Sequence, residues 1–368
     1  MDRAMRIAFD AKRAFANSRG LGNYSRDTLR LMATYAPEHA YYYFGVPTER
    51  FCPSTGTVVS PQGVWKAVPS LWRSMGCVAD LKRKGIEVYH GLSGEIPFGI
   101  HRTGIKTIVT VHDLIFLRYP ELYSRTYRWL FTEKVRYACR YATRIIAISE
   151  QTKQDIIDYF GVAPDRITVV YQGCSNLFRQ PVSAEQVKDV LQRHGIEGKY
   201  IIDVGAIEPR KNLKNLLLGM AEAHIDTPLV VIGGHSRYAD EMKALAGQFG
   251  LDVRMLHGVP FADFPALYKG AECLVYPSVF EGFGIPILEA MCAGTPVVTS
   301  VGSCFQETGG DAALYADPHS PNSIGEQLKR VLSDAALRDK MTARGYKQSE
   351  KFADEEVAHH LIDVYATL

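Results

Sequence analysis

The chain has 368 residues, of which 46% are hydrophobic and 22% are charged, and its formal net charge is +2. This length exceeds what one hydrophobic core usually serves, so two domains of about 150 to 200 residues each are expected. The composition excludes a disordered, fibrous or disulfide-stabilised protein. The opening segment, MDRAMRIAFDAK, has no apolar stretch of the length that a secretory signal needs. No apolar run approaches the roughly 20 residues of a membrane-spanning helix.

The seven cysteines include no C-x-x-C pair that would indicate a metal or redox site. They are therefore expected to be reduced and mostly buried, which favours the cytoplasm over an oxidising compartment. The charge is unevenly distributed, because residues 1–180 carry a net charge of +10 and the remainder −8. A basic first half indicates an anionic partner, such as a lipid phosphate or the inner face of a membrane.

Short apolar runs alternate with helical patterns in the first half, which predicts βαβ units and a parallel sheet. The runs are Arg6 to Phe9, Val88 to His90, Lys106 to Val111, Arg144 to Ile148 and Ile167 to Val170. Two glycines, Gly20 and Gly22, follow the first run in a predicted loop, and a helix is expected from about Asn23. A lone G-x-G is as typical of a plain strand-to-helix turn as of a binding loop.

His112 and Asp113 directly follow the run that ends at Val111, at the sheet edge where open parallel sheets bind ligands. A single histidine in such a place is more often structural. Farther on, Ser149 and Gln151 resemble a helix cap and are interpreted as structural.

The segment RTYRWLFTEKVRYACRYATR, residues 125–144, carries six arginines and lysines, one acid and interleaved aromatic residues. Such a helix suits an anionic interface or a lipid-diphosphate acceptor. It equally suits an amphipathic helix whose aromatic side chains face the core. The additional cations Lys82, Arg83 and Lys84 favour the interface.

The strand rhythm pauses between about residues 173 and 199 and then resumes, which predicts two Rossmann-like halves. The second series comprises Tyr200 to Val204, Leu229 to Ile232, Val253 to Leu256, Cys273 to Val275 and Pro296 to Thr299. The predicted domains are residues 1–178 and 196–351, and the last stretch, 352–368, is predicted to be a helix that packs back on the first domain.

Two adjacent cations, Arg210 and Lys211, lie where a strand ending near Gly205 leads into a helix that restarts around Asn212. Adjacent cations at a helix start are usually solvated surface charge. At the end of a second-domain strand they would instead neutralise a departing diphosphate in a site without a metal ion.

Residues 273–300, CLVYPSVFEGFGIPILEAMCAGTPVVTS, are predicted to form strand, glycine loop, helix and strand. Gly282 and Gly284 allow close approach to a ligand, and the helix start that follows suits a phosphate. Glu289 lies among apolar helix neighbours, and a buried carboxylate needs partners. The hydroxyls of a ribose would supply hydrogen bonds to Glu289. The plainer alternative is that Glu289 accepts from backbone amides and that Glu281 is solvated.

EGFGIPILEA, with PS before it and AGTPVV after it, closely resembles the E-x7-E signature of the retaining GT-B glycosyltransferases of the group 1, or family 4, type. The resemblance spans nearly the whole chain and is closest to bacterial mannosyltransferase-like members of surface-polysaccharide pathways. It implies an α/β fold of GT-B type, with two Rossmann-like domains whose parallel sheets face each other across a cleft.

The resemblance also implies roles for residues of the second half. Glu281 contacts the donor sugar, Phe283, Gly284 and Ile285 present backbone amides to the sugar and diphosphate, and Glu289 binds the ribose. Relatives carry an arginine directly after the residue equivalent to Gly205, where this chain has Ala206, so Arg210 takes that role beside Lys211. Gly258 and Val259, within HGVPFADFPALYKGAECLVYPS, hold the base. In the first half, Gly22 with Asn23 closes over the donor, and His112 bonds the transferred sugar.

The expected activity is transfer of a hexose, mannose from GDP-mannose first and UDP-linked sugars next, to a saccharide or lipid-linked acceptor with retention of configuration. No cofactor or metal is expected, because no two aspartates are spaced as D-x-D. No nucleic-acid partner is expected. The alternatives are a nucleotide-sugar epimerase or hydrolase on the same fold, and a noncatalytic binding subunit; a dinucleotide oxidoreductase is disfavoured because neither glycine loop completes G-x-G-x-x-G.

Overall fold

A computed structural model of the chain describes residues 4–17, 20–49 and 51–368. The chain forms two compact units, the first made of Met1–Gln172 with Asp354–Leu368 and the second of Gly173–Ala353. The sequence-based boundaries, 178 and 196, left a connecting segment unassigned. In the structure that segment contains α8 (Ala184–Arg193), which packs on α11 (Phe264–Gly270) and so belongs to the second unit.

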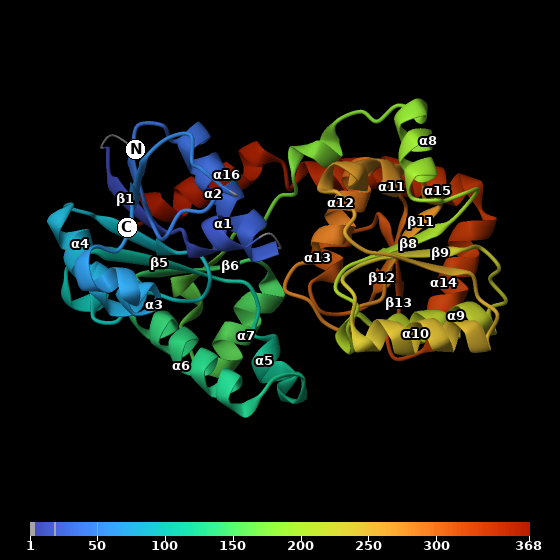
Figure 1. Cartoon of the computed structure of the whole chain (residues 1–368), viewed down its shortest axis with the longest axis horizontal. Helices are drawn as coiled ribbons and strands as arrows, with labels where there is room; N and C mark the ends of the chain where they lie inside the picture. Colours follow the sequence, from blue (N-terminus) through green and yellow to red (C-terminus); the bar gives the residue numbers. More distant parts are fainter. Residues whose placement is uncertain (1–3, 18–19, 50) are drawn as a thin grey trace. The chain divides into compact units, whose positions relative to one another are not determined.

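The first unit is built on a seven-stranded parallel sheet with the order β3-β2-β1-β4-β5-β6-β7. Its strands are β1 (Arg6–Asp10), β2 (Ala40–Phe44), β3 (Thr57–Val59), β4 (Val88–Gly91), β5 (Lys106–Val111), β6 (Arg144–Ala147) and β7 (Ile167–Val169). Its helices are α1 (Lys12–Ala16), α2 (Gly20–Tyr35), α3 (Pro69–Leu71), α4 (Cys77–Arg83), α5 (Ile115–Arg118), α6 (Arg125–Tyr141), α7 (Glu150–Phe160) and α16 (Asp354–Ala366). α2 and α16 cover one face of the sheet, and α6 and α7 cover the other (Figure 1).

The second unit repeats the arrangement with a six-stranded parallel sheet of order β10-β9-β8-β11-β12-β13. Its strands are β8 (Ile201–Val204), β9 (Leu229–Ile232), β10 (Val253–Leu256), β11 (Cys273–Tyr276), β12 (Val297–Ser300) and β13 (Ala313–Ala316). Its other helices are α9 (Leu213–Glu222), α10 (Arg237–Gln248), α12 (Ile285–Ala293), α13 (Phe305–Gly309), α14 (Pro321–Ser333) and α15 (Ala335–Glu350). Figure 1 shows α9, α10 and α14 on one face of the sheet, and α11 and α12 on the other.

These sheets confirm the predicted α/β class, and all ten strands expected from apolar runs are present within a residue or so of their predicted ends. Three strands, β2, β3 and β13, were not predicted. β2 has the sequence AYYYF, whose tyrosines hide the apolar pattern although Tyr43 is buried. β3 and β13 are short, with three and four residues, and each lies at a sheet edge. The facing of the two sheets across a cleft stays a prediction.

The expected loop around Gly20 and Gly22 is wrong, because α2 begins at Gly20 rather than near Asn23. Gly22 lies buried in the first turn of that helix. A Cβ atom at Gly22 would lie 1.9 Å from the carbonyl oxygen of Asn17, so only glycine allows the helix to start this close to the preceding chain.

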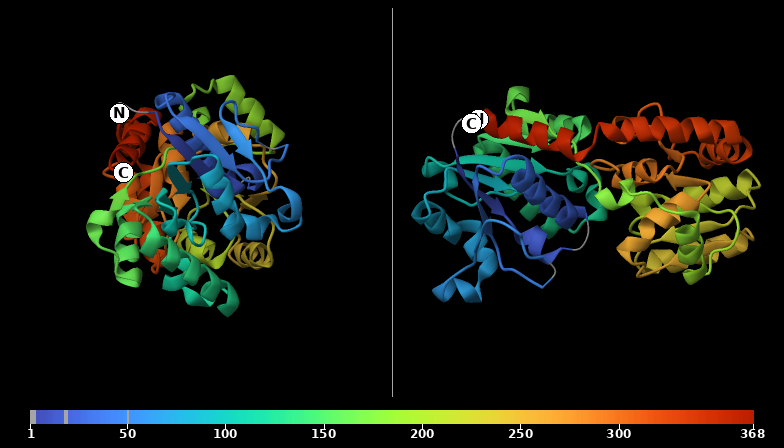
Figure 2. Two further views of the ribbon diagram at one scale, coloured as in Figure 1. Left: turned by 90° about the vertical axis from the view of Figure 1, so that its left-hand side faces the viewer. Right: turned by 90° about the horizontal axis from the view of Figure 1, so that it is seen from above.

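The C-terminal helix α16 packs against α2 and so belongs to the first unit (Figure 2). Its Tyr365 is fully buried, and the phenol oxygen lies 2.6 Å from Nδ1 of His90 on β4. The other ring nitrogen of His90 lies 2.8 Å from Oγ1 of Thr110 on β5. Burial, with a smaller effect of His112, lowers the pKa of His90 to about 3, so the ring is neutral. The last helix is thus tied to the centre of the first sheet by a buried hydrogen bond.

None of the described helices combines the length and the apolar composition that crossing a bilayer requires. Six of the seven cysteines are buried and all seven carry free thiols, as predicted; only Cys52 is exposed.

Tyr365→Phe should lower the free energy of unfolding of the first unit by about 1 to 3 kcal/mol, because it leaves a buried ring nitrogen of His90 without its partner. All three tryptophans, Trp65, Trp72 and Trp129, lie in the first unit, so urea unfolding followed by tryptophan fluorescence reports on that unit. Tyr159→Phe, at a site 40% exposed, is the matched control and should leave the midpoint unchanged. Equal midpoints for the two variants would show that the buried hydrogen bond contributes nothing.

Candidate functional site

The strand order of the second sheet brings two loops together at its carboxyl edge. β8 and β11 are neighbours although the chain passes through β9 and β10 between them, and ligands bind beside such a reversal in open parallel sheets. The loop after β8 contains Arg210 and Lys211, and the loop after β11 contains Glu281. A backbone hydrogen bond of 2.9 Å from Val279 N to Arg210 O joins the two loops.

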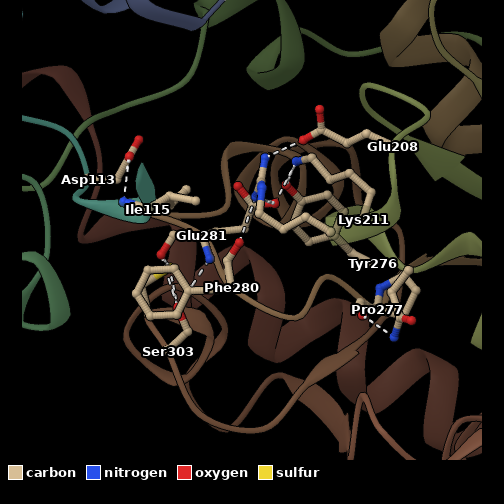
Figure 3. Close-up of polar contacts among 12 residues, drawn as sticks. Asp113, Ile115, Glu208, Lys211, Tyr276, Pro277, Phe280, Glu281 and Ser303 are labelled. Carbon is tan, nitrogen blue, oxygen red and sulfur yellow. Dashed lines mark hydrogen bonds and ion pairs between the residues drawn. The ribbon is translucent and has the colours of Figure 1, made fainter. Parts of the chain in front are cut away.

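Glu281 is bound by both cations, and Figure 3 shows its contact with Lys211. Its Oε1 is 2.7 Å from Nη1 of Arg210 and 2.6 Å from Nζ of Lys211. Glu281 is 9% exposed. Burial opposes ionisation of this carboxyl, but the charges of Lys211 and Arg210 outweigh burial, and its pKa is lowered. Glu281 is therefore a carboxylate that two cations share, and not the solvated residue of the plainer interpretation.

Arg210 and Lys211 are fixed by further contacts, and their side chains are only 12% and 14% exposed. The Arg210 guanidinium donates to the Phe280 carbonyl at 2.6 Å and pairs with Glu208 at 2.7 Å. Lys211 Nζ donates to the Tyr276 hydroxyl at 2.6 Å and lies 4.7 Å from the centre of the Tyr276 ring. The alternative that this pair is ordinary surface charge is wrong.

Asn212 shapes the loop that carries the two cations. It adopts a left-handed conformation, φ 65°, which asparagine tolerates better than most residues, directly before α9. Its side-chain amide donates to the carbonyls of Pro277 at 3.0 Å and Pro318 at 2.7 Å, so it also ties the loop after β8 to the loop after β11. The sequence prediction that a helix restarts around Asn212 is confirmed, because α9 begins at Leu213.

Ser303, in the loop after β12, holds the backbone of Glu281. Its hydroxyl donates to the Glu281 carbonyl at 2.9 Å and accepts from the Glu281 amide at 3.2 Å. Ser303 has a positive φ of 48°, which is uncommon for a residue with a side chain. Sequence reasoning missed Ser303, Tyr276 and Asn212, because each acts from a loop or strand distant in sequence from its partner.

The glycine loop and the helix of the E-x7-E segment form as predicted. Gly284 precedes α12 with φ 92°, and Gly294 ends the helix with φ 78°, so both occupy conformations that favour glycine. Phe283 is buried, and its carbonyl accepts from Thr308 Oγ1 at 2.5 Å. Gly282 lies in the same buried loop, and Ile285 is the first residue of α12. A helix start suits an anion, although Pro286 has no amide hydrogen and the Ile287 amide already donates to the Gly284 carbonyl at 3.0 Å.

Glu289 lies on α12 and is 9% exposed. Its Oε2 accepts a 3.0 Å hydrogen bond from the hydroxyl of Tyr268, a fully buried residue of α11. Burial raises the pKa of Glu289 to about 7, although the Tyr268 bond acts in the opposite direction. The carboxyl therefore exists in both ionisation states near neutral pH.

A second buried carboxyl, Asp203 on β8, was not singled out from the sequence. Burial raises its pKa to about 7, and the charge of Lys211 lowers it in part. Asp203, Gly205 and Lys211 line one small cavity at the end of β8. A Cβ atom at Gly205 would lie 3.5 Å from Cε of Lys211, so the side chain of Lys211 packs directly over Gly205.

Gly258 and Val259 follow β10, at the same edge of the sheet but farther from β8. Gly258 is exposed with φ 68°, and no atom lies within 4 Å of the place where a Cβ would be. Among the described residues, no hydrogen bond or ion pair joins either residue to Glu281, Arg210 or Lys211. The structure therefore places them at the carboxyl edge without bringing them into that cluster.

His112, Gly22 and Asn23 belong to the first unit. Nε2 of His112 donates to the Leu92 carbonyl at 2.8 Å, and the ring meets Tyr24 edge-on with centroids 4.5 Å apart. Burial lowers the pKa of His112 to about 4, so the ring is neutral. Asn23 accepts from Arg26 at 2.6 Å. A neutral His112 with its Nε2 occupied keeps only Nδ1 for a ligand.

Ser149 and Gln151 lie at the start of α7. Ser149 caps α7 as predicted, accepting from the Thr152 amide at 3.0 Å, whereas Gln151 is not part of the cap and donates to Asp155.

Within the described part of the chain, no three His, Cys, Asp or Glu side chains gather as metal ligands. The expectation that no metal takes part stays a prediction.

Two protein families match this chain. Residues 188–348 match the family described as Glycosyl transferases group 1, and residues 38–175 match Glycosyltransferase Family 4. Together they cover most of both units.

Among curated proteins, the chain is similar to O-antigen chain mannosyltransferase B of Escherichia coli, with 31% identity over 76% of this chain and 74% of the relative. It is also 30% identical to the serotype-specific mannosyltransferase WbdA of Escherichia coli over 72% of this chain, but it spans only 34% of the length of that protein. Among solved structures, Anabaena HepE in complex with UDP-glucose superimposes with a TM-score of 0.76 at 16% identity, covering 99% of this chain and 100% of HepE. That likeness supports the fold.

Glu281→Gln should destabilise the second unit by about 3 kcal/mol, because it leaves two partly buried cations without the anion they share. The measurement is urea unfolding followed by far-ultraviolet circular dichroism. Tryptophan fluorescence, which reports on the first unit alone, is the internal control.

Glu208→Gln is the matched variant and should cost less than about 1 kcal/mol, because the Glu208 side chain is 43% exposed. A Glu281→Gln protein as stable as Glu208→Gln would contradict the importance of the shared carboxylate.

Proposed function

The chain belongs to the group 1 glycosyl transferase family, and on that premise we propose that it moves a hexose from a nucleotide-sugar donor to a saccharide or lipid-linked acceptor in surface-polysaccharide synthesis. The protein is thus a glycosyltransferase. Mannose from GDP-mannose is the first candidate donor and a UDP-linked hexose the second. The proposed outcome is retention of configuration without a metal ion, with the departing diphosphate helping to deprotonate the acceptor hydroxyl.

One observation carries the proposal: two cations at the reversal of strand order share a single buried carboxylate. Arg210 is positioned by the Phe280 carbonyl and Lys211 by the Tyr276 hydroxyl, which leaves their cationic groups beside the loop and helix start of the E-x7-E segment. A diphosphate is the ligand whose charge matches both the cation pair and the helix amides.

The same arrangement gives the cations a role in the reaction. As the glycosidic bond breaks, negative charge grows on the diphosphate, and pre-positioned cations stabilise it without reorganisation. When the diphosphate pairs with Arg210 and Lys211, Glu281 is released from part of its ion pairing. Its carboxylate then accepts hydrogen bonds from hydroxyls of the transferred sugar.

Glu289 and Tyr268 supply the proposed ribose site. The carboxylate oxygens of Glu289 can accept from both ribose hydroxyls, and Tyr268 holds one of those oxygens at 3.0 Å, which fixes the carboxyl plane. Gly258 and Val259 are proposed to contact the base. In the first unit, His112 is proposed to bond the transferred sugar through Nδ1, and Gly22 to keep the start of α2 close to the donor.

The donor identity rests on the names of relatives. The two curated relatives described above are called mannosyltransferases, which favours GDP-mannose. The structurally similar HepE was solved with UDP-glucose, which keeps a UDP-linked sugar as the second candidate.

A peripheral contact with an anionic membrane from the cytoplasmic side is proposed for the first unit. The helix α6 carries Trp129, 66% exposed, and Tyr127, 41% exposed, next to arginines. Its Val135, Ala138 and Cys139 are buried, and Phe131, Tyr137 and Tyr141 pack partly buried against the core, in line with the amphipathic-helix interpretation. Contact with an interface stays a proposal. Exposed aromatic and basic side chains together are typical of interfacial helices.

The donor is tested by thermal shift with GDP, UDP and their hexose conjugates, since a ligand that binds only the folded state raises the melting temperature. We expect GDP-mannose to give the largest shift. Lys211→Ala should abolish that shift, because it removes one of the two cations proposed to bind the diphosphate.

Lys214→Ala, an exposed lysine on the next helix, is the control and should keep the shift. Turnover of donor at full rate without acceptor would instead identify an epimerase or hydrolase. Binding without any transfer would identify the noncatalytic alternative. Unchanged sugar transfer by the Lys211→Ala variant would contradict the proposed diphosphate site.

The affinity for GDP-mannose should rise with pH through about 7, because ribose hydroxyls donate to the ionised form of Glu289, whose pKa lies at about 7. Below that pKa the dissociation constant should increase about tenfold for each pH unit by which the pH falls, and above that pKa the affinity should level off. Titration calorimetry from about pH 5.5 to about pH 8.5 measures this.

Glu289→Gln should bind more weakly and lose the pH dependence, whereas Asp203→Asn, which removes the other carboxyl with a raised pKa, should keep it. A pH dependence that survives in Glu289→Gln and disappears in Asp203→Asn would show that Asp203, and not Glu289, is the group that titrates.

A further inference from the structure

The first unit has a groove of about 540 Å³ between the second half of α6 and the turn of residues 98–102. Its lining includes Met75, Phe98, Arg102, Arg136, Tyr137 and Arg140. The turn precedes β5, and α6 ends shortly before β6 begins, so the groove lies toward the amino ends of these strands. His112 follows the carboxyl end of β5. The groove is therefore separate from the ligand-binding edge of the first sheet.

The groove is held in shape by the Tyr137 hydroxyl. This hydroxyl accepts from the Gly99 amide at 2.7 Å and lies 3.0 Å from Nδ1 of His101. The His101 ring in turn stacks on Tyr141, with centroids 4.1 Å apart and planes 16° apart. These contacts fix the turn of residues 98–102 to the helix, so the groove is present before any ligand binds.

The charge in the groove is positive and only partly compensated. Arg136 pairs with Glu133 of the same helix. Among the residues that the structure describes, no carboxylate pairs with Arg102 or Arg140. Two guanidinium groups therefore line one groove without an anion.

Arg140 is not required to complete the end of α6. Arg166 already donates to the free carbonyls there, at 2.9 Å to Cys139 and 2.5 Å to Ala142. Arg140 itself lies with its guanidinium carbon 5.3 Å from the centre of the Tyr141 ring. An aromatic ring thus supports Arg140 at the groove while its N–H groups stay available for a ligand.

One side of the groove is apolar and exposed. Met75 is 47% exposed and Phe98 is 40% exposed, and the Phe98 amide donates to the Ser74 carbonyl at 2.7 Å, which keeps these segments adjacent. Val68 and Leu71, 43% and 46% exposed, lie earlier in the same segment, Val68 directly before α3 and Leu71 at its end.

We propose that this groove binds the phosphate group of an amphipathic phosphate ester, with Arg102 and Arg140 binding the phosphate and Met75 with Phe98 contacting the apolar part. Guanidinium groups bind phosphate oxygens in pairs of parallel hydrogen bonds, and two of them match a diphosphate. The inference goes beyond the donor site and does not depend on it. The same chemistry is offered by a lipid headgroup or lipid-linked phosphate and by a soluble phosphate ester.

The test uses geranyl diphosphate, a soluble probe with a diphosphate and a short apolar chain, on the full chain. Hydrogen exchange measured by mass spectrometry should slow in residues 98–103 and 133–141. Arg102→Gln with Arg140→Gln should lose this protection, and the dissociation constant should rise about tenfold for each guanidinium removed. Both substitutions lie at the surface and leave the fold intact. Arg125→Gln, at the other end of α6, is the matched control and should bind like the wild type.

Two further probes separate the sources of the ligand. Protection by inorganic diphosphate equal to that by the geranyl ester would indicate a soluble phosphate compound and would contradict the apolar contact with Met75 and Phe98. Protection by phosphatidylglycerol vesicles but not by phosphatidylcholine vesicles would indicate a lipid headgroup. The proposal is overturned if none of these probes protects the groove, or if the double variant is protected like the wild type.

The same experiment also distinguishes binding in the groove from binding at the donor site. Protection of residues 98–103 and 133–141 should persist in Lys211→Ala. Protection confined to residues 205–212 and 281–289 would support the donor site and overturn the groove.

Discussion

The second unit depends on a buried carboxylate that cannot remain ionised alone. An unpaired charge removed from water costs several kcal/mol, so the Glu281 carboxylate requires its two cations as long as no ligand is present. The cations in turn need an anion, because Arg210 and Lys211 are only slightly exposed. This mutual requirement keeps three side chains together in the absence of ligand. A diphosphate that takes over the two cations must therefore come with hydrogen-bond donors for the Glu281 carboxylate, such as the hydroxyls of a linked sugar.

The fold makes this possible by bringing three loops to one place. The loops after β8 and β11 meet because those strands are neighbours, and the loop after β12 supplies Ser303 to hold the Glu281 backbone. The first sheet has the same reversal between β1 and β4, but it is filled differently. There Arg73 pairs with Asp10 at 2.5 Å and Glu95 at 2.6 Å, and Lys134 pairs with Glu95 as well. Each of these two cations thus has a largely buried acid within the unit, whereas Arg210 and Lys211 share one.

The sequence predicted the fold better than the contacts of the site. Runs such as Leu229 to Ile232 are apolar on both faces and identify a buried parallel strand directly, whereas the tyrosines of β2 do not. Glu281, Arg210 and Lys211 were each identified, but nothing in their local patterns shows that they bind one another. Tyr276 has the appearance of any strand residue, and its contact with Lys211 arises only when β8 and β11 pair.

Carboxyl groups of the second unit differ in ionisation because their neighbours differ. Glu281, with two cations, has a lowered pKa, whereas Glu289, whose hydrogen-bond partner is the neutral Tyr268, has a pKa raised to about 7. Glu281 is therefore already ionised without a ligand. To bind a ligand it must exchange its ion pairs with Arg210 and Lys211 for hydrogen bonds to that ligand. Hydroxyl groups of a ligand that donate to Glu289 favour its ionised form. The first carboxyl thus responds to the charge of a ligand and the second to its hydroxyl groups, so a nucleotide diphosphate linked to a sugar satisfies both, and a phosphate or a sugar alone satisfies only one.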